Sequence, residues 1–489
     1  MNVIVLVADS WQFNYLGCYG NPWIQTPNLD AFAARSVVFE NAYAEASPTV
    51  PTRRAFLTGR YTLPYGGWQA LGPQERTLTD ILWSQPLYTA LVSDTSPLRL
   101  PGFGYTRGFD YVRFFRGQEF DRFYSQDPCS LEVERFHKPA FITTPAGKRE
   151  ESRASLYCRH ELENYLPQRQ HWRTDQDQMV AQVVRGALDY LERRDRGRPF
   201  LLWLDSFDPH EPWDPPSVWD RDRSCPYDPD YQGQEIINPV PTYVEGYLDQ
   251  AEQHHIRMLY AEKITVVDKW LGKVLDRLEE EGLYQDSLVI FVSDHGQPLG
   301  QGPHGHGIIR KCRPWPYEEL VHIPLIVHCP GVEPGRVSAL VQSVDLAPTI
   351  LDYLGVDQGG ERMQGQSLLP LMRGQVDKLR DLAIAGYYNF SWSIITEEWS
   401  FIHWLDQDKH YTDNPLAPAA AVGLASHQDK SHVWTCTPGS QTETPERDEL
   451  YHRGRDPFQQ HNLLEEHPGV AEELYQRLRE FMLELRSQA

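Results

Sequence analysis

Short apolar runs alternate along this chain with segments whose apolar residues recur at helical spacing. Three of the runs, 2–7, 200–204 and 287–292, are continuous and end in polar residues, as buried strands do. In segments 179–191 and 260–278 the apolar residues recur on one face of a helix. Strands that alternate with helices in this way predict a parallel sheet with helices covering both faces.

The pattern changes after about residue 375. Three short segments beyond it resemble antiparallel strands, and these are 393–396, 401–404 and 449–451. A final helix is predicted after Pro468, where apolar residues again recur at helical spacing. We therefore expect an α/β domain over residues 1–375 and a smaller C-terminal subdomain over residues 376–489, which a chain of 489 residues is long enough to form.

Charge and cysteine content argue against several classes of partner. The formal net charge of −22 would repel a nucleic-acid backbone. No apolar run approaches the roughly 20 residues that span a bilayer, and the opening segment resembles a strand rather than a signal peptide. The seven cysteines form no Cys-x-x-Cys pair; they are Cys18, Cys129, Cys158, Cys225, Cys312, Cys329 and Cys436. We expect reduced thiols in a soluble cytoplasmic protein, with a homo-oligomer left open.

Ligand-type residues stand at the ends of two predicted strands. Asp9 ends the first strand, and Asp294 and His295 directly follow the strand 287–292. Sites in open α/β sheets lie beyond the carboxyl ends of the strands, and carboxylates and imidazoles bind divalent metals. The same residues also serve as turn formers and helix caps, so each signal taken alone leaves both interpretations open.

A third cluster, residues 48–60, predicts a helix with an anion site at its start. Pro51 suits the first turn and Gly59 the end, which places Thr49 just before the N-terminus. Free backbone N–H groups and the helix dipole favour an anion there, and Arg53 adds charged hydrogen-bond donors. A capped surface helix remains the alternative. Two further polar clusters lie at 208–212 and 305–311.

The order and spacing of these clusters resemble the sulfatase branch of the alkaline phosphatase superfamily, which includes arylsulfatases, choline sulfatase and phosphonate monoester hydrolases. The resemblance covers nearly the whole chain. Its motifs lie at 9, 16–20, 26–30, 57–60, 208–210, 294–296, 306–311, 323–326, 330–331, 344–349, 449–451 and 456–457. It implies an alkaline-phosphatase-like α/β fold: a large mixed, mostly parallel sheet sandwiched by helices, plus a smaller C-terminal α+β subdomain with an antiparallel sheet.

The resemblance also implies roles for individual residues. The ligands of one divalent metal ion would be Asp9, Asp294, His295 and the nucleophile at position 49. The groups that hold the non-bridging oxygens or the leaving group would be Arg53, His210 and Lys311. His306 is close to this set in the motif order and would contact the substrate. The metal would be Ca, Mn, Mg or Zn.

The sequence departs from the family pattern at the nucleophile. Typical members carry Cys or Ser there, which is oxidised to formylglycine, whereas Pro51 and Arg53 fix Thr49 in that register. Threonine cannot yield this aldehyde, so we expect no formylglycine and an unmodified threonine alkoxide, because a metal lowers the pKa of a bound hydroxyl. The resemblance to members with phosphorylated threonine moves the expectation towards phosphate or phosphonate esters, with sulfate esters still open.

Two smaller departures affect the metal and substrate sites. Ser10 stands where many members have a second aspartate, so one carboxylate is lost. Residues 92–96 replace a segment that carries a lysine and a histidine in arylsulfatases, and Asp94 appears there instead. Asp94 either caps a loop or contacts the substrate, by accepting a hydrogen bond from a hydroxyl or by attracting a cationic group.

The sequence therefore predicts a metal-dependent hydrolase that cleaves sulfate, phosphate or phosphonate esters of a small anionic substrate. One alternative is a pseudoenzyme that keeps the fold and binds a ligand. Against it, the ligand and anion-binding residues are retained as a set. The other alternative is a two-metal phosphodiesterase, which needs further Asp and His ligands in the region where Lys311 stands.

Overall fold

The computed structural model describes residues 1–99, 101–119, 121, 131–143, 146–169, 172–220, 222–311, 315–358, 363–388, 390–405 and 447–487. Four cysteines in these ranges are free thiols, namely Cys18, Cys158, Cys225 and Cys329. The other three predicted thiols, Cys129, Cys312 and Cys436, lie outside the described residues. Among the described helices, none is long and apolar enough to cross a membrane.

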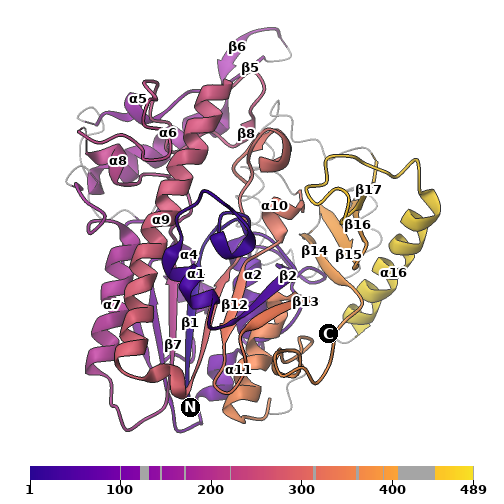
Figure 1. The fold of residues 1–489 in the computed structure, drawn as a ribbon. Helices are drawn as coiled ribbons and strands as arrows, with labels where there is room; N and C mark the ends of the chain where they lie inside the picture. The colour runs from indigo at the N-terminus through magenta and orange to yellow at the C-terminus, as the bar shows by residue number, and fades with distance from the viewer. Residues whose placement is uncertain are drawn as a thin grey trace.

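An eight-stranded mixed sheet forms the centre of the molecule (Figure 1). Its strands, in spatial order, are β13 (Gly335–Gln342), β2 (Val37–Tyr43), β12 (Leu325–His328), β9 (Ser287–Ser293), β1 (Asn2–Ala8), β7 (Phe200–Ser206), β3 (Tyr88–Ser93) and β4 (Tyr111–Phe114). The five strands from β9 to β4 are parallel, whereas β12 runs antiparallel to both of its neighbours. The predicted mixed, mostly parallel sheet is confirmed.

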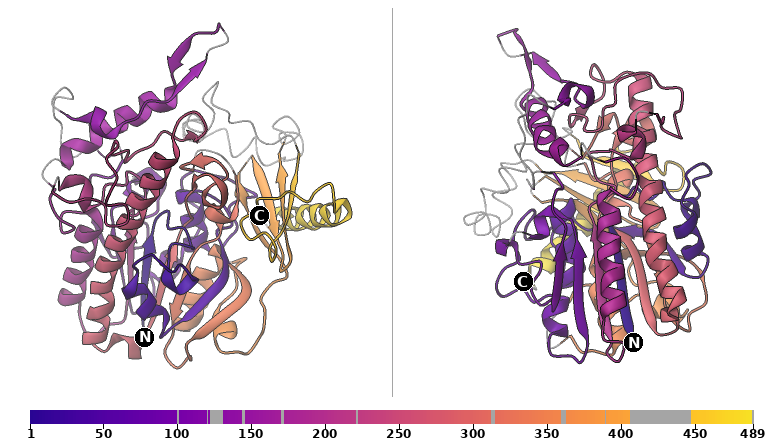
Figure 2. Two further views of the ribbon diagram at one scale, coloured as in Figure 1. Left: turned by 45° about the horizontal axis from the view of Figure 1, so that its top comes forward. Right: turned by 90° about the vertical axis from the view of Figure 1, so that its left-hand side faces the viewer.

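Helices cover both faces of this sheet, as predicted. Alternate residues of β1 face opposite cores: Ile4 and Leu6 pack with α7 and α9, and Val3 and Val5 pack with α2 and α11. The helices of the first face are α1 (Pro27–Ala33), α7 (Met179–Arg193) and α9 (Gln250–Glu280), and those of the second include α2 (Thr49–Thr58), α3 (Leu78–Leu82), α11 (Leu346–Leu354) and α12 (Leu369–Met372). A side view shows α7 and α9 lying along the sheet (Figure 2).

Insertions form a cap beyond the carboxyl ends of the parallel strands (Figures 1 and 2). The elements of this region are α4 (Ser96–Arg99), α5 (Val133–Phe136), β5 (Phe141–Thr143), β6 (Arg149–Glu151), α6 (Arg153–Tyr165), α8 (Pro216–Trp219), β8 (Thr242–Tyr243), β10 (Leu299–Gly300), β11 (Ile308–Ile309) and α10 (Glu318–Val321). The cap surrounds the edge at which β1, β7 and β9 end, which is where the polar clusters of the sequence lie.

A second, antiparallel sheet of four strands follows in the C-terminal part of the chain. It consists of β14 (Ala383–Tyr387), β15 (Ser391–Ile395), β16 (Trp399–Trp404) and β17 (Glu449–His452), and α16 (Pro468–Ser487) packs against it. The last three strands and the helix were predicted, whereas β14 was not. The core of this region continues into α2 through Ala55. The division at residue 375 stays a prediction.

Candidate active site

The ends of two neighbouring strands bring the predicted metal ligands together. β1 and β9 are parallel and in register, with Ala8 opposite Ser293. Asp9 and Asp294 are the next residues of the two strands, so their side chains start from adjacent points of the sheet edge. One ligand atom each from Asp9, Asp294 and His295 lies within 4.8 Å of the others. All three residues are fully buried.

Arg53 lies among carboxylates at this edge. Its Nη1 donates to Asp9 Oδ2 at 3.0 Å and also to Asp294, and its Nη2 donates to Asp205 Oδ1 at 2.7 Å. Burial raises the pKa of Asp9, and the charge of Asp294 raises it further, against the opposing charge of Arg53. Three carboxyl groups thus surround one guanidinium, and a cluster with more carboxyl groups than positive groups suits a divalent cation.

Thr49 is the first residue of α2, so the helix begins one residue earlier than predicted and ends as predicted at Gly59, which has a φ of 62°. Thr49 Oγ1 lies 3.3 Å from His295 Nε2. Because His295 Nδ1 donates to the Gly296 carbonyl at 2.7 Å, Nε2 carries the free electron pair. Burial lowers the pKa of His295 to about 4, which keeps the ring neutral and able to bind a metal.

His210 and Lys311 meet near Asp9. His210 Nδ1 donates to the Glu211 carbonyl at 2.6 Å, and His210 Nε2 accepts from Lys311 Nζ at 2.7 Å. Burial, with the charge of Lys311, lowers the pKa of His210 to about 3, so the ring is a neutral acceptor. Lys311 Nζ also donates to Ser10 Oγ at 3.2 Å, and Ser10 Oγ in turn donates to Asp9 Oδ1 at 2.7 Å. This chain connects Lys311 to the metal-ligand cluster.

Asp94 is turned into the protein. Its Oδ1 accepts from the Phe207 N–H at 2.7 Å and its Oδ2 from Gln118 Nε2 at 2.9 Å, and the side chain is fully buried. Burial and the charge of Asp208 raise the pKa of Asp94 to about 8. Both carboxylate oxygens are therefore engaged within the protein, and the contact of Asp94 with substrate stays a prediction.

His306 is also engaged elsewhere. Its Nδ1 lies 2.6 Å from Glu319 Oε1, its Nε2 lies 2.9 Å from the Gln459 carbonyl, and its ring stacks on Tyr317 at 3.6 Å between centroids. Both ring nitrogens thus have partners in the protein. No recorded contact between described residues joins His306 to Thr49, and its substrate-binding role stays a prediction.

Two carboxylates at the site were missed from the sequence. Asp205, inside β7, accepts from Arg53 and from Thr95 Oγ1 at 2.6 Å. Glu211 accepts from Arg310 Nε at 2.7 Å, and although burial alone would raise its pKa, the neighbouring positive charges hold that pKa well below the usual range. An acidic residue within an otherwise apolar strand was the available signal for Asp205.

Several residues with a strained backbone lie next to residues of the candidate site. Five non-glycine residues among those described have a positive φ: Ser10, Glu119, His306, Arg310 and Gln459, with φ between 45° and 62°. Ser10 adjoins Asp9, and Arg310 adjoins Lys311. Non-glycine residues in this region cost roughly 1–3 kcal/mol each and concentrate at functional sites.

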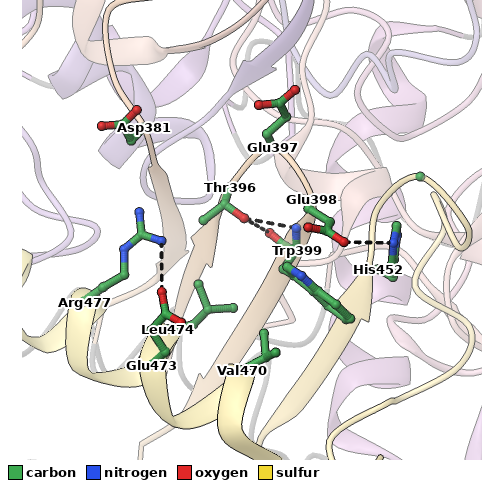
Figure 3. Close-up of a pocket in the computed structure, with 11 residues that line it drawn as sticks. Asp381, Thr396, Glu397, Glu398, Trp399, His452, Val470, Glu473, Leu474 and Arg477 are labelled. Carbon is green, nitrogen blue, oxygen red and sulfur yellow. Dashed lines mark hydrogen bonds and ion pairs between the residues drawn. The ribbon is translucent and has the colours of Figure 1, made fainter. Parts of the chain in front are cut away.

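A separate hollow of about 660 Å³ opens between the C-terminal sheet and α16 (Figure 3). Its lining is Asp381, Thr396, Glu397, Glu398, Trp399, His452, Gly454, Val470, Glu473, Leu474 and Arg477. Figure 3 shows Glu398 directed to His452 and Glu473 directed to Arg477. None of the predicted site residues lines this hollow.

Comparison with known families gives two matches. Residues 1–356 match the family model described as Sulfatase. Residues 305–413 match the model of the C-terminal part of N-sulphoglucosamine sulphohydrolase. Among curated proteins, an arylsulfatase of Clostridium perfringens is 26% identical, with 88% of this chain and 91% of that protein covered. The multifunctional alkaline phosphatase superfamily protein PehA of Trinickia caryophylli is also 26% identical, with 76% and 77% covered.

Solved structures share the fold. One was determined in complex with its substrate, D-glucosamine-2-N,6-O-disulfate; it superposes with a TM-score of 0.68 at 19% identity, covering 99% of this chain and 98% of that one. The phosphonate monoester hydrolase of Agrobacterium radiobacter superposes with a TM-score of 0.67 at 18% identity, covering 100% and 95%. These likenesses extend over the α/β core, the cap and the C-terminal sheet together.

Proposed function

Because the chain belongs to the sulfatase family and is an ester-hydrolysing enzyme, we propose that it cleaves sulfate, phosphate or phosphonate esters with Thr49 as nucleophile and one divalent metal ion as cofactor. The observation that carries the proposal is the position of the Thr49 hydroxyl, 3.3 Å from His295 Nε2 within the Asp9, Asp294 and His295 cluster. A hydroxyl there needs no conversion to formylglycine in order to attack.

The donor set fits a divalent metal. Asp9 and Asp294 would each supply a carboxylate oxygen, His295 its Nε2 and Thr49 its hydroxyl oxygen. This mixed oxygen and nitrogen set suits Mg, Mn, Zn or Ca, and the excess of carboxyl groups over positive groups described above favours cation uptake. When bound, the ion would lower the pKa of the Thr49 hydroxyl and polarise the ester.

The remaining residues would bind the anionic ester and its leaving group. Lys311 Nζ, fixed by His210 Nε2 and Ser10 Oγ, would donate to a non-bridging or leaving oxygen as negative charge develops there. The Thr49 oxygen would form a bond to sulfur or phosphorus while the bond to the alcohol oxygen breaks, and the alcohol departs with a proton. Water would then cleave the ester on Thr49, release the inorganic or phosphonic acid and restore the hydroxyl.

The alternatives gain less support. A pseudoenzyme does not agree with membership of an ester-hydrolysing family. For a two-metal phosphodiesterase, further carboxylates and imidazoles would have to stand beside the first ion. The described residues contain one close group of three such ligands, and the ammonium of Lys311, linked to Asp9 through Ser10, adjoins it where a second cation would be repelled.

A panel of 4-nitrophenyl sulfate, phosphate and phosphonate esters tests the proposal. The recombinant wild type should turn over at least one of them without any maturation factor. Thr49→Ala should lose most of this turnover with its fold intact, and Thr49→Ser should keep part of it, because the hydroxyl survives. Mass spectrometry should find a sulfuryl, phosphoryl or phosphonyl adduct on Thr49. Wild-type turnover in Thr49→Ala would show that Thr49 is not the nucleophile.

Metal analysis provides a separate test. The purified wild type should hold one divalent ion per chain, and Asp294→Asn should hold clearly less, because one of the carboxylate ligands becomes a neutral amide. Asp94→Asn is the matched control, since Asp94 is an equally buried aspartate that accepts its hydrogen bonds away from the ligand group. Two ions per chain would favour the phosphodiesterase alternative.

A further inference from the structure

Glu119 places a carboxylate beside the proposed leaving-group site. Its Oε1 lies 4.0 Å from His210 Nε2, the nitrogen that accepts from Lys311 Nζ at 2.7 Å. Its side chain is 26% exposed, against 4% for His210, and Thr49 is 1% exposed as a whole residue. Glu119 is therefore more open than Glu211, the other acidic group beside His210, and a substrate group bound outward of His210 would meet it.

The Glu119 carboxyl is held in place through one of its two oxygens. Oε2 accepts from Ser96 Oγ at 3.0 Å, at the start of α4, whereas Oε1 has no closer donor among the described residues. The preceding residue, Gln118, is fixed by its Nε2, which donates to Asp94 Oδ2 at 2.9 Å and to Asp208 Oδ1 at 3.3 Å. Glu119 itself is held at a φ of 45°. Asp94 thus acts indirectly, by positioning the segment that carries Glu119.

An ionised Glu119 would be unfavourable for a substrate that carries only negative charge, because like charges a few ångströms apart repel by an amount that matters in a partly buried site. Lys311 is already shared with Glu211, whose carboxylate oxygens lie 3.4 Å from Lys311 Nζ, and cannot compensate both acids and an incoming anion fully. An ester that brings its own positive charge removes the conflict, because its anionic end faces Lys311 and its cationic end faces Glu119.

We propose that Glu119 selects zwitterionic esters, whose alcohol or phenol part carries a protonated amine. This inference rests on the proposed function, since it assigns the leaving-group side of the same site. Burial raises the pKa of Glu119 to about 8, with a further contribution from the charge of Glu161. An ammonium group bound beside Oε1 would favour the ionised carboxylate, so substrate binding and ionisation of Glu119 would support each other.

The test compares two esters of nearly equal shape: 4-(aminomethyl)phenyl and 4-ethylphenyl esters of the acid that the wild type turns over best. The quantity measured is the ratio of their kcat/KM values. We expect the wild type to prefer the aminomethyl ester and Glu119→Gln to reduce the ratio about 10-fold, as for loss of one close charge pair. The control is Glu163→Gln, since Glu163 on α6 has 30% exposure and pairs with His160 away from the site.

Binding without turnover provides the second measurement. Both esters should be titrated calorimetrically into Thr49→Ala and into Thr49→Ala/Glu119→Gln, so that the result does not depend on catalysis. The double variant should bind the aminomethyl ester about 10-fold more weakly than Thr49→Ala does. Its affinity for the ethyl ester should fall by less.

Three outcomes would overturn the assignment of Glu119. They are an unchanged ratio of the two kcat/KM values in Glu119→Gln, an equal loss of kcat/KM for both esters, and the same change of the ratio in Glu163→Gln. An equal loss would identify Glu119 as a proton donor or a structural group. Failure of the proposed function is distinguishable, because the wild type would then turn over none of the 4-nitrophenyl esters, while calorimetry with the two phosphate esters would still report on Glu119.

Discussion

Arg53 connects three carboxylates that start from three neighbouring strands, through its contacts with Asp9, Asp205 and Asp294. Replacing it with alanine leaves these charges buried without their counter-ion. We expect Arg53→Ala to lower the free energy of unfolding by about 3–5 kcal/mol, measured by urea denaturation. Arg54→Ala, one residue along the same helix, removes a more exposed pair with Glu75 and should cost about 1 kcal/mol or less.

The same variant distinguishes a metal site from a purely structural ion-pair cluster. If Asp9 and Asp294 bind a divalent ion, added Mn should stabilise Arg53→Ala more than it stabilises the wild type, because the ion replaces part of the missing positive charge. No stabilisation of either protein would contradict a metal site at this position, and equal stabilisation would mean that the ion does not replace the charge of Arg53.

Single residues show how far the sequence alone could lead at the site. Asp9, Asp294 and His295 could be predicted to converge because each follows a recognisable strand. For Asp205 the sequence offered only an acidic residue in an apolar strand, since its role depends on the pairing of β7 with β3 and β1 and on the reach of Arg53 from α2. Sequence spacing likewise could not reveal that Asp94 points inward while Glu119, 25 residues further on, points to the site.

Among the elements, the turn after β9 depends on a close approach of two chains. Gly296 donates to the Leu320 carbonyl at 2.7 Å, and a Cβ at position 296 would lie 2.1 Å from the Glu319 carbonyl oxygen. Gly296→Ala should cost about 1–3 kcal/mol of stability. It should also lower turnover, because the Gly296 carbonyl orients His295.

Gly335→Ala is the matched control for this prediction. Gly335 opens β13, and a Cβ there would meet nothing within 4 Å. The unfolding free energy of Gly335→Ala should stay within about 0.5 kcal/mol of that of the wild type. Similar values for the two alanine variants would mean that the turn after β9 tolerates movement and does not fix His295.

The strands also show where hydrophobic patterning is enough to predict an element from the sequence. Strands β1, β7 and β9 are buried on both faces, so their continuous apolar runs were recognisable to within one or two residues. β14, with the sequence Ala-Ile-Ala-Gly-Tyr, has neither alternation nor a strong apolar run, and its pairing with β15 makes it a strand. The antiparallel insertion of β12 between β9 and β2 is likewise a matter of tertiary pairing.

For the whole molecule, the net charge and the buried carboxyl groups both lower the free energy of unfolding as pH rises. Burial raises the pKa of Glu45 to about 7 and those of Asp94 and Glu119 to about 8. Between pH 6.5 and 8 the folded protein therefore holds more protons than the unfolded chain, so stability falls as pH rises. Each group contributes about 1–2 kcal/mol over that interval, and self-repulsion from a net charge of −22 adds to the loss.

The buried histidines do not reverse this fall in stability between pH 6.5 and 8. The pKa values of His210, His295 and His304 are lowered by burial to about 3, 4 and 4, so their contribution to stability is complete above pH 6.5 and is lost only in acid. Urea midpoints measured at pH 6.5 and pH 8 should show the fall, and Glu45→Gln should reduce it. A stability that rises over this range would contradict the assigned pKa directions.

The ion pairs of Arg53 also bear on how the enzyme is made. An internal cation holds Asp9, Asp205 and Asp294 together as soon as α2 packs beneath the sheet, so folding need not wait for an encounter with an ion. A newly synthesised chain would then resist proteolysis before loading, and an ion removed by a chelator could be replaced without refolding. Since the proposed Thr49 chemistry requires no oxidising partner either, maturation would reduce to folding followed by capture of a metal.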